Sequence, residues 1–124
     1  MRNTDDVVSI DEVIEYGLTL PRSTEGVVRG RRKLYIKQIV YVAHEAEGIF
    51  GFAHPKEWRE ALVETDPEKF LMPIHQGDLR WNWACVRMDR IGPAEMRELV
   101  LDAWAFVVPR SVADAYAAAH PAPD

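Results

Sequence analysis

The chain has 124 residues, of which 48% are hydrophobic and 28% charged, and its formal net charge at pH 7 is −5. This size and composition are typical of one soluble globular domain, and the acidic balance means that nucleic acids and anionic membranes weakly repel the molecule as a whole. The single cysteine, Cys85, excludes an internal disulfide and a cysteine-based zinc cluster. No apolar run approaches the ~20 residues of a transmembrane helix, and the N-terminus lacks the apolar core of a signal peptide. We therefore expect a cytoplasmic protein without a membrane segment.

Charge is distributed unevenly along the chain. Residues 29–37 carry +5 and no acidic residue, whereas residues 1–28 and residues 38–72 each sum to −4. A third of the 15 basic residues therefore lie in one short stretch. This stretch is the first candidate for contact with an anionic partner.

A first helix is predicted over Val8–Leu18. Ser9 and Glu12 have the spacing of a capping box, in which each residue bonds to the backbone of the other. The Leu20–Pro21 pair ends this helix. Residues Arg22–Val28 are expected to form a connection.

Three short runs of β-forming residues follow, namely Arg31–Lys37, Ile39–His44 and Ile49–Ala53. In the first run, Leu34 and Ile36 alternate with polar residues, which predicts a half-buried strand. The polar link of residues 45–48 ends in a glycine, so a hairpin is expected between the second and third runs.

The second half of the chain predicts three helices and one further strand. A helix begins at Pro55, a strand spans Trp81–Met88, the longest helix runs from Pro93 to Val107, and a shorter helix begins at Ser111. Residues 119–124 are expected to form a disordered tail. Together these elements predict one α+β domain over residues 1–124, with a small antiparallel sheet of about four strands flanked by N-terminal, middle and C-terminal helices.

Several local phrases occur in this chain in a characteristic order. They are Leu20-Pro21, Phe52-Ala53-His54-Pro55, Thr65-Asp66-Pro67-Glu68-Lys69-Phe70 with Pro73, Trp83-Ala84-Cys85-Val86-Arg87-Met88-Asp89, Glu98-Leu99-Val100-Leu101-Asp102-Ala103-Trp104, and Val108-Pro109-Arg110. Their order and spacing over about residues 9–116 resemble the MmcQ/YjbR-like family.

The resemblance implies a compact α+β domain of the YjbR-like type, related in shape to the CyaY-like fold. The family carries a DNA-binding label and has no catalytic residues attached to it, so the resemblance implies a non-enzymatic protein that binds DNA. This chain departs from the family at the first hairpin, where Lys37-Gln38 stands in place of a Gly-Lys pair and Gly30 precedes the strand.

The basic stretch is the candidate nucleic-acid site. Arg31, Lys33 and Lys37 alternate along one strand with Tyr35 among them, so cations could meet phosphates while the aromatic ring stacks on an unpaired base. The whole candidate set is Arg29, Arg31, Arg32, Lys33, Tyr35, Lys37 and Arg87. The alternative is that these charges solvate an outer sheet face, protect an edge strand and pair with the acidic helices.

A second candidate surface contains Trp81 and Trp83, which lie on the side of their strand opposite Val86 and Met88. Tryptophan and arginine dominate the energetics of interfaces, so this side predicts contact with a protein or a small ligand. The alternative is that both tryptophans are buried by packing.

The sequence predicts no metal site, no cofactor and no enzyme activity. The four histidines, His44, His54, His75 and His120, lack the spacing of zinc motifs, and Cys85 has no neighbouring base that would activate a thiol. Two functions therefore remain open. The chain is either a small cytoplasmic protein that binds DNA through its basic strand, or a protein- or small-ligand-binding module with no nucleic-acid role.

Overall fold

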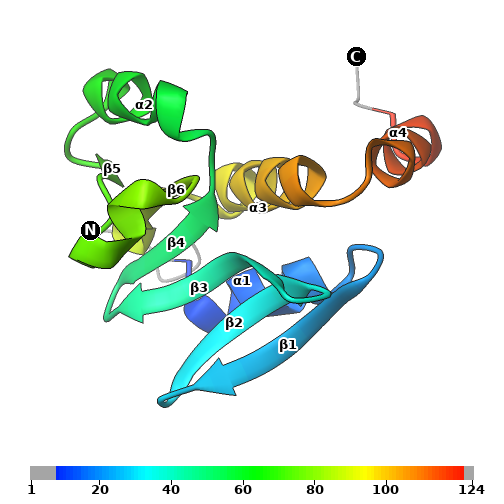
Figure 1. Cartoon of the computed structure of the whole chain (residues 1–124), viewed down its shortest axis with the longest axis horizontal. Helices are drawn as coiled ribbons and strands as arrows, with labels where there is room; N and C mark the ends of the chain where they lie inside the picture. Colours follow the sequence, from blue (N-terminus) through cyan, green and yellow to red (C-terminus); the bar gives the residue numbers. More distant parts are fainter. Residues whose placement is uncertain (1–7, 122–124) are drawn as a thin grey trace.

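The computed structural model describes residues 8–121 and contains a six-stranded antiparallel sheet (Figure 1). The strands follow the order β1-β2-β3-β4-β6-β5, so only β5 and β6 depart from chain order. In chain order the elements are α1 (Ile10–Leu18), β1 (Ser23–Val28), β2 (Arg31–Ile36), β3 (Ile39–Ala46), β4 (Ile49–Ala53), the 3₁₀ helix η2 (Lys56–Trp58), α2 (Arg59–Thr65), β5 (Phe70–Leu71), the 3₁₀ helix η3 (Gln76–Arg80), β6 (Trp83–Arg87), the 3₁₀ helix η4 (Met88–Arg90), α3 (Pro93–Val107) and α4 (Arg110–Ala119).

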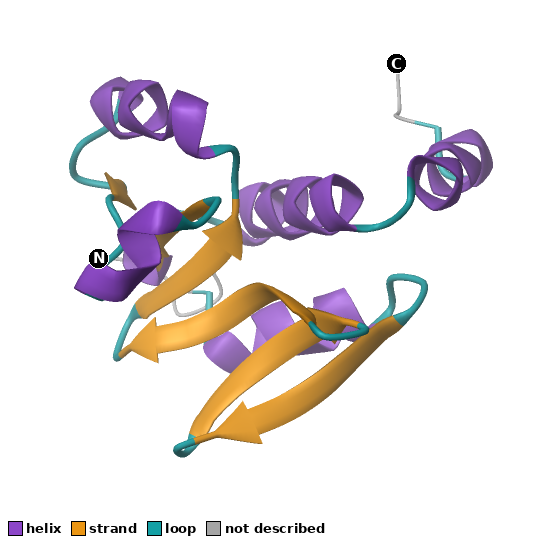
Figure 2. Cartoon of the chain, in the orientation of Figure 1, coloured by secondary structure: helices purple, strands orange, loops and turns teal. Residues whose placement is uncertain are grey.

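Helices α1 and α3 pack against one face of the sheet and against each other, and α1 lies behind the strands in Figure 2. The core between these layers is made by side chains from the inner sheet face and from both helices. It includes Val13, Ile14, Leu34, Val42, Phe50, Phe52, Val86, Met96, Val100 and Trp104. Gly17 allows α1 to approach closely, because a Cβ at this position would lie 2.2 Å from Cδ1 of Leu34. The opposite face of the sheet is called the outer face below, and no long helix among residues 8–121 covers it (Figure 1).

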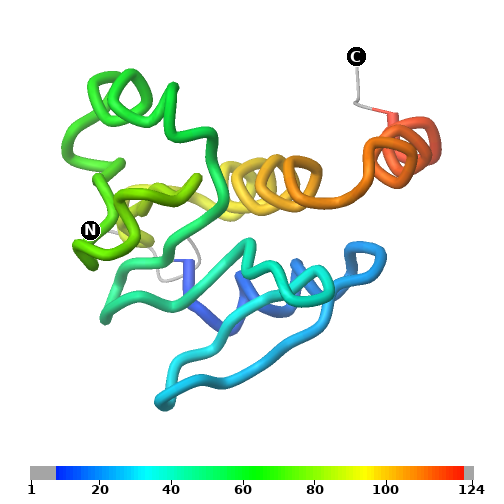
Figure 3. Tube along the Cα trace, in the orientation of Figure 1, coloured from blue at the N-terminus to red at the C-terminus, as the bar shows by residue number. Residues whose placement is uncertain are grey.

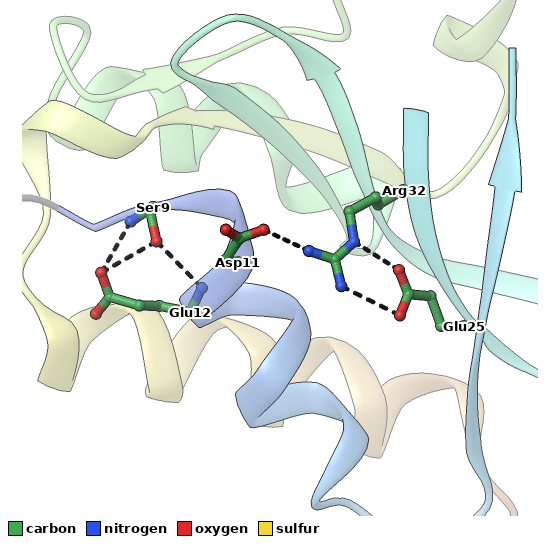
Figure 4. A network of polar contacts seen from close by, with 5 residues as sticks. All are labelled: Ser9, Asp11, Glu12, Glu25 and Arg32. Atoms are coloured by element: carbon green, nitrogen blue, oxygen red, sulfur yellow. Dashed lines mark hydrogen bonds and ion pairs between the residues drawn. The ribbon is translucent and has the colours of Figure 1, made fainter. Parts of the chain in front are cut away.

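The predicted helix ends are confirmed at two places. The Ser9 Oγ accepts from the Glu12 backbone N–H at 3.2 Å, and the Glu12 carboxylate accepts from the Ser9 N–H at 3.2 Å, as Figure 4 shows. This is the capping box that the sequence predicts. Helix α3 begins at Pro93 and ends at Val107, as expected.

The sheet has six strands where about four were expected, because β1 and β5 were missed. β1 was predicted to be a connection, since its sequence Ser-Thr-Glu-Gly-Val-Val has no apolar alternation. An edge strand that buries few side chains needs no apolar alternation. β1 is held instead by its antiparallel hydrogen-bond ladder to β2. β5 has only two residues, paired with Val86 and Cys85, which is too short to leave a pattern.

The turns of the sheet are tighter than the sequence suggested. Strand β3 continues to Ala46, so the β3–β4 link is Glu47-Gly48 and not four residues. The β1–β2 turn places both Arg29 and Gly30 at positive φ, 54° and 77°. At the β2–β3 turn Lys37 adopts φ 56°, a conformation that usually selects glycine or asparagine.

Helix α4 stands at the far end of α3, away from the sheet (Figure 3). It is tied to the core by Tyr116, whose ring packs edge-on against Trp104 at 5.1 Å between centroids. Pro109 and not Ser111 is the N-cap residue. The helix includes Ala119, which is the first residue of the predicted disordered tail. Residues 122–124 of that predicted tail lie outside the described residues. Within residues 8–121, no helix is long and apolar enough to span a bilayer.

His54, at the end of β4, makes the stability of the fold depend on pH. Burial lowers the pKa of His54, and together with the Arg59 guanidinium it outweighs a backbone hydrogen bond with Trp58 and the Asp102 carboxylate, which both raise that pKa. Its Nε2 is buried and has no hydrogen-bond partner among the described residues. Since the folded pKa lies below the unfolded value of ~6.5, acid protonates the unfolded chain first and favours unfolding.

We therefore expect His54→Gln to reduce the loss of unfolding free energy between about pH 7.5 and about pH 5.5. Urea denaturation at both pH values measures this difference. His120→Gln, at an exposed position after α4, is the control and should keep the wild-type difference. An unchanged difference in His54→Gln would contradict the assignment.

Candidate binding groove on the outer sheet face

A groove of about 550 Å³ lies between the β2–β3 hairpin, the segment around η3 and the C-terminal end of α3. Its lining contains few charges and several aromatic and aliphatic side chains. The lining residues are Lys33, Gln38, Ile39, Val40, Ala43, Glu45, Ala53, Asp78, Trp81, Asn82, Trp83, Phe106 and Val107. The groove therefore joins residues that are far apart in sequence.

Small residues create the hollow in the outer face. Ala43 pairs with Gly51 across β3 and β4, and Ala53 pairs with Trp83 across β4 and β6. The Trp83 indole packs directly on Gly51, where a Cβ would lie 2.4 Å from its Nε1. Any larger residue at position 51 would therefore displace the indole from the floor of the groove.

Glu45 is a buried acid that holds the Trp83 indole in place. It is 7% exposed, and its Oε1 accepts a hydrogen bond from Trp83 Nε1–H at 2.9 Å. Its Oε2 lies 3.0 Å from Nε2 of His75, and the same nitrogen lies 3.0 Å from the Arg31 guanidinium. With a hydrogen on Nε2, His75 donates to Glu45; without it, the nitrogen accepts from Arg31. The Glu45 charge thus already has partners inside the protein.

Arg59 fixes the opposite wall. This side chain on α2 is 7% exposed, and its Nη1 donates to the carbonyl oxygens of Trp81 and Trp83, each at 3.0 Å. Its Nη2 donates to the carbonyl of Leu79 at 2.8 Å. The Asn82 side chain adds a bond, since its Oδ1 accepts from the Lys56 N–H at 3.0 Å. The Arg59 bonds hold the backbone at and on both sides of Trp81, so they define the position of that residue.

The rim of the groove exposes three large apolar side chains from three separate elements. Ile39 at the start of β3 is 52% exposed, Trp81 after η3 is 57% exposed, and Phe106 near the end of α3 is 45% exposed. The Arg80 guanidinium lies over the Trp81 ring, 4.9 Å from its centroid. Single exposed apolar residues are ordinary, but three around one hollow form a surface suited to a ligand.

The predicted basic residues do not gather on one surface. Arg32 points to the helix layer, where its guanidinium bonds to Glu25 and Asp11 (Figure 4). Arg29 and Lys37 occupy the turns at opposite ends of β2. Of the remaining four, Arg31, Lys33 and Tyr35 lie on the outer face of β2, and Arg87 is exposed at the end of β6. Binding of nucleic acid by this set stays a prediction.

The two predicted tryptophans have different environments. Trp81 is exposed at the rim, whereas Trp83 is 8% exposed and forms the floor. Sequence reasoning missed Arg59 as a site residue and placed Glu45 in a link, because their partners are remote in sequence. Gly51 was the available signal, since a glycine inside a strand often marks a close approach.

Cys85 on β6 is a free, buried cysteine. Burial raises the pKa of the Cys85 thiol to about 12, so it stays protonated at neutral pH. Among the described residues, no three His, Cys, Asp or Glu side chains come together as a metal site.

The fold is similar to a solved structure, that of Deinococcus radiodurans protein DR2400, a domain of the DUF419 family. The two match with a TM-score of 0.68 and 16% sequence identity, over 99% of this chain and 94% of the other. This likeness establishes the fold. DUF419 is a MmcQ/YjbR-like family, so the neighbour has the fold that the sequence resemblance implied. No family model matches the sequence, and no curated protein matches it.

The three carbonyl bonds of Arg59 predict that Arg59→Lys destabilises the fold, although the substitution keeps the positive charge. In Arg59→Lys an ammonium keeps the charge but cannot reach three carbonyls in a planar fork. Since a hydrogen bond from a charged group contributes ~1.5–3 kcal/mol, we expect the unfolding free energy to fall by about 2 kcal/mol or more. Urea denaturation measures it, with Arg97→Lys on α3 as the matched control. A loss equal to that of the control would show that the carbonyl bonds contribute little.

Proposed function

We propose that this protein is a non-enzymatic binding module and that its ligand occupies the groove beside Trp81. The observation that supports this is the convergence of Ile39, Trp81 and Phe106 on one hollow of about 550 Å³. Small-molecule sites have volumes of ~300–1,000 Å³, mostly apolar walls and a few polar groups that orient the ligand. Gln38, Asp78 and Asn82 are such groups here.

A ligand site needs walls that are in place before binding, because ordering them would consume binding energy. Arg59 fixes the segment that bears Trp81, and Glu45 fixes the Trp83 floor. The apolar rim residues are therefore presented by a rigid frame. This favours a small ligand over a partner protein, which would need a much larger area than the groove offers.

We also propose that the chain is a single domain of the MmcQ/YjbR-like family that acts in the cytoplasm. The ordered sequence phrases and the DUF419 neighbour support the family, and the match over 99% of this chain and 94% of the neighbour supports one domain. A lone cysteine suits a reducing compartment.

A nucleic-acid strand is the second candidate ligand. The observation in its favour is that Arg31, Lys33 and Tyr35 lie side by side on the outer face of β2, which gives two cations and one aromatic ring in a row. Phosphate contact and base stacking use this combination. The family label points the same way.

The groove proposal predicts that Trp81 controls binding of a neutral apolar probe. N-phenyl-1-naphthylamine should fluoresce on binding to the wild type, and Trp81→Ala should weaken it about fivefold, because the ring loses its main contact. Trp58→Ala is the matched control, since Trp58 is also exposed, at 67%, but lies outside the groove lining. Circular dichroism checks folding. Equal effects of both variants, or no binding by the wild type, would contradict the proposal.

The nucleic-acid candidate predicts that Arg31→Gln/Lys33→Gln abolishes most binding of labelled single-stranded DNA in fluorescence anisotropy. For duplex DNA, log affinity should fall with log salt at a slope of about −0.9 per neutralised phosphate. The control Arg97→Gln/Arg110→Gln removes the same charge from α3 and α4 and should bind like the wild type. Negligible binding by all three proteins at low salt would remove this candidate.

A further inference from the structure

The polar side chains of the groove differ in whether they already have partners. Glu45 bonds to Trp83 and His75, and Asn82 bonds to the backbone of Lys56. Within residues 8–121, by contrast, the Lys33 ammonium and the Asp78 carboxylate make no hydrogen bond or ion pair through their side chains. These two charges are therefore the ones available to a ligand.

Lys33 is half-buried in the middle of the outer face, with no large neighbour in either adjacent strand. It pairs with Gly26 on β1, over which the Tyr35 ring lies, and with Ala43 on β3, so on the β3 side its side chain is bordered only by a methyl group. A partly desolvated cation in a hollow attracts an anion more strongly than one in open solvent does. The nearby Glu45 does not supply that anion, because His75 and Trp83 hold its carboxylate.

The two free charges lie on opposite walls and orient a ligand. Lys33 belongs to β2, whereas Asp78 belongs to η3 and lies more than 4.0 Å from it, since the two form no ion pair. An anionic group beside Asp78 would be repelled, so it must lie at the β2 wall. The same groove is lined by Trp81, whose ring centroid lies 4.9 Å from the Arg80 guanidinium.

We propose that the groove binds an aromatic organic anion, with its carboxylate or phosphate on the Lys33 ammonium and its ring against Trp81 and Phe106. N–H or O–H donors at the other end of the ligand face Asp78. This inference rests on the groove function proposed above and adds the chemical class of the ligand. One planar ring and one anionic group match the aromatic wall and Lys33, which among residues 8–121 is the one lysine or arginine in the groove lining.

Two probes with the same aromatic skeleton test the anion requirement. 8-Anilinonaphthalene-1-sulfonate is N-phenyl-1-naphthylamine with one added sulfonate. Lys33→Met should weaken the sulfonate probe about tenfold, because it removes a charge-assisted contact, and should change binding of the neutral probe less than about twofold. Arg97→Met, which removes a charge from the helix layer, should affect neither probe.

The outcomes separate this inference from the groove function. If the wild type binds neither probe, the groove function itself is wrong. If it binds both and Lys33→Met weakens both equally or neither, the groove stands and the anion class is wrong. Circular dichroism and urea denaturation of Lys33→Met show whether the variant is folded; if it is not, Lys33→Gln replaces it.

Competition identifies the source of the anion. AMP and indole-3-acetate, at millimolar concentration, should displace the sulfonate probe from the wild type better than adenosine and indole do. Displacement by AMP assigns a phosphate, and displacement by indole-3-acetate assigns a carboxylate. Displacement by neither anion, or equal displacement by the neutral pair, would overturn the proposal.

Discussion

The groove depends on one buried cation that has no acidic partner among the described residues. Arg59 is 7% exposed, and its two terminal nitrogens donate to the carbonyl oxygens of Leu79, Trp81 and Trp83, whereas its buried Nε has no partner among the described residues. A buried guanidinium needs hydrogen-bond acceptors, and the carbonyls of an irregular segment need donors. The bonds between them therefore offset the free-energy cost of burying both groups. The backbone before β6 is therefore held as firmly as a strand, although it has no ladder of its own. The position of Trp81 is therefore set by the hydrogen bonds of Arg59.

The hollow itself arises because the outer face is only partly covered. The segment around η3 lies over β6 and buries Trp83, Cys85 and Glu45, whereas the β1–β2 side of the same face has no cover. Between the covered and open parts, Ala43, Gly51 and Ala53 present almost no side chain. A sheet with helices on one face can thus form a site on its other face without inserting a domain. The apolar floor is protected by Glu45, whose bond to Trp83 prevents the indole from turning into the space.

Elements with a strong period could be predicted from sequence, and those held by remote partners could not. Helices α1 and α3 and strands β2 to β4 show apolar residues at helical or alternate spacing, and the structure contains them. β1 and β5 bury too little to show a period. The groove was harder to predict than the fold, because its hydrogen bonds join residues far apart in sequence. Arg59 donates to carbonyls 20 to 24 positions away, and Glu45 and Trp83 are separated by 38 positions. The basic stretch illustrates the converse. Strand alternation and turns separate these five cations: Arg32 faces the helix layer, Arg31 and Lys33 lie on the outer face, and Arg29 and Lys37 lie in turns at opposite ends of β2.

That separation bears on which anion suits the protein. A nucleic-acid strand interacts with an extended surface, and the acidic groups that give the chain its net charge of −5 repel it within the ~10 Å over which salt at 0.1 M leaves charges unscreened. Arg32 contributes little to such a surface, because Glu25 and Asp11 already neutralise it. A small anion needs only one accessible cation within a few ångströms, and a hollow that excludes much of the solvent strengthens that attraction together with the repulsion from Asp78. Lys33 satisfies that local condition, and the aromatic wall beside it supplies the contact area that a single charge lacks.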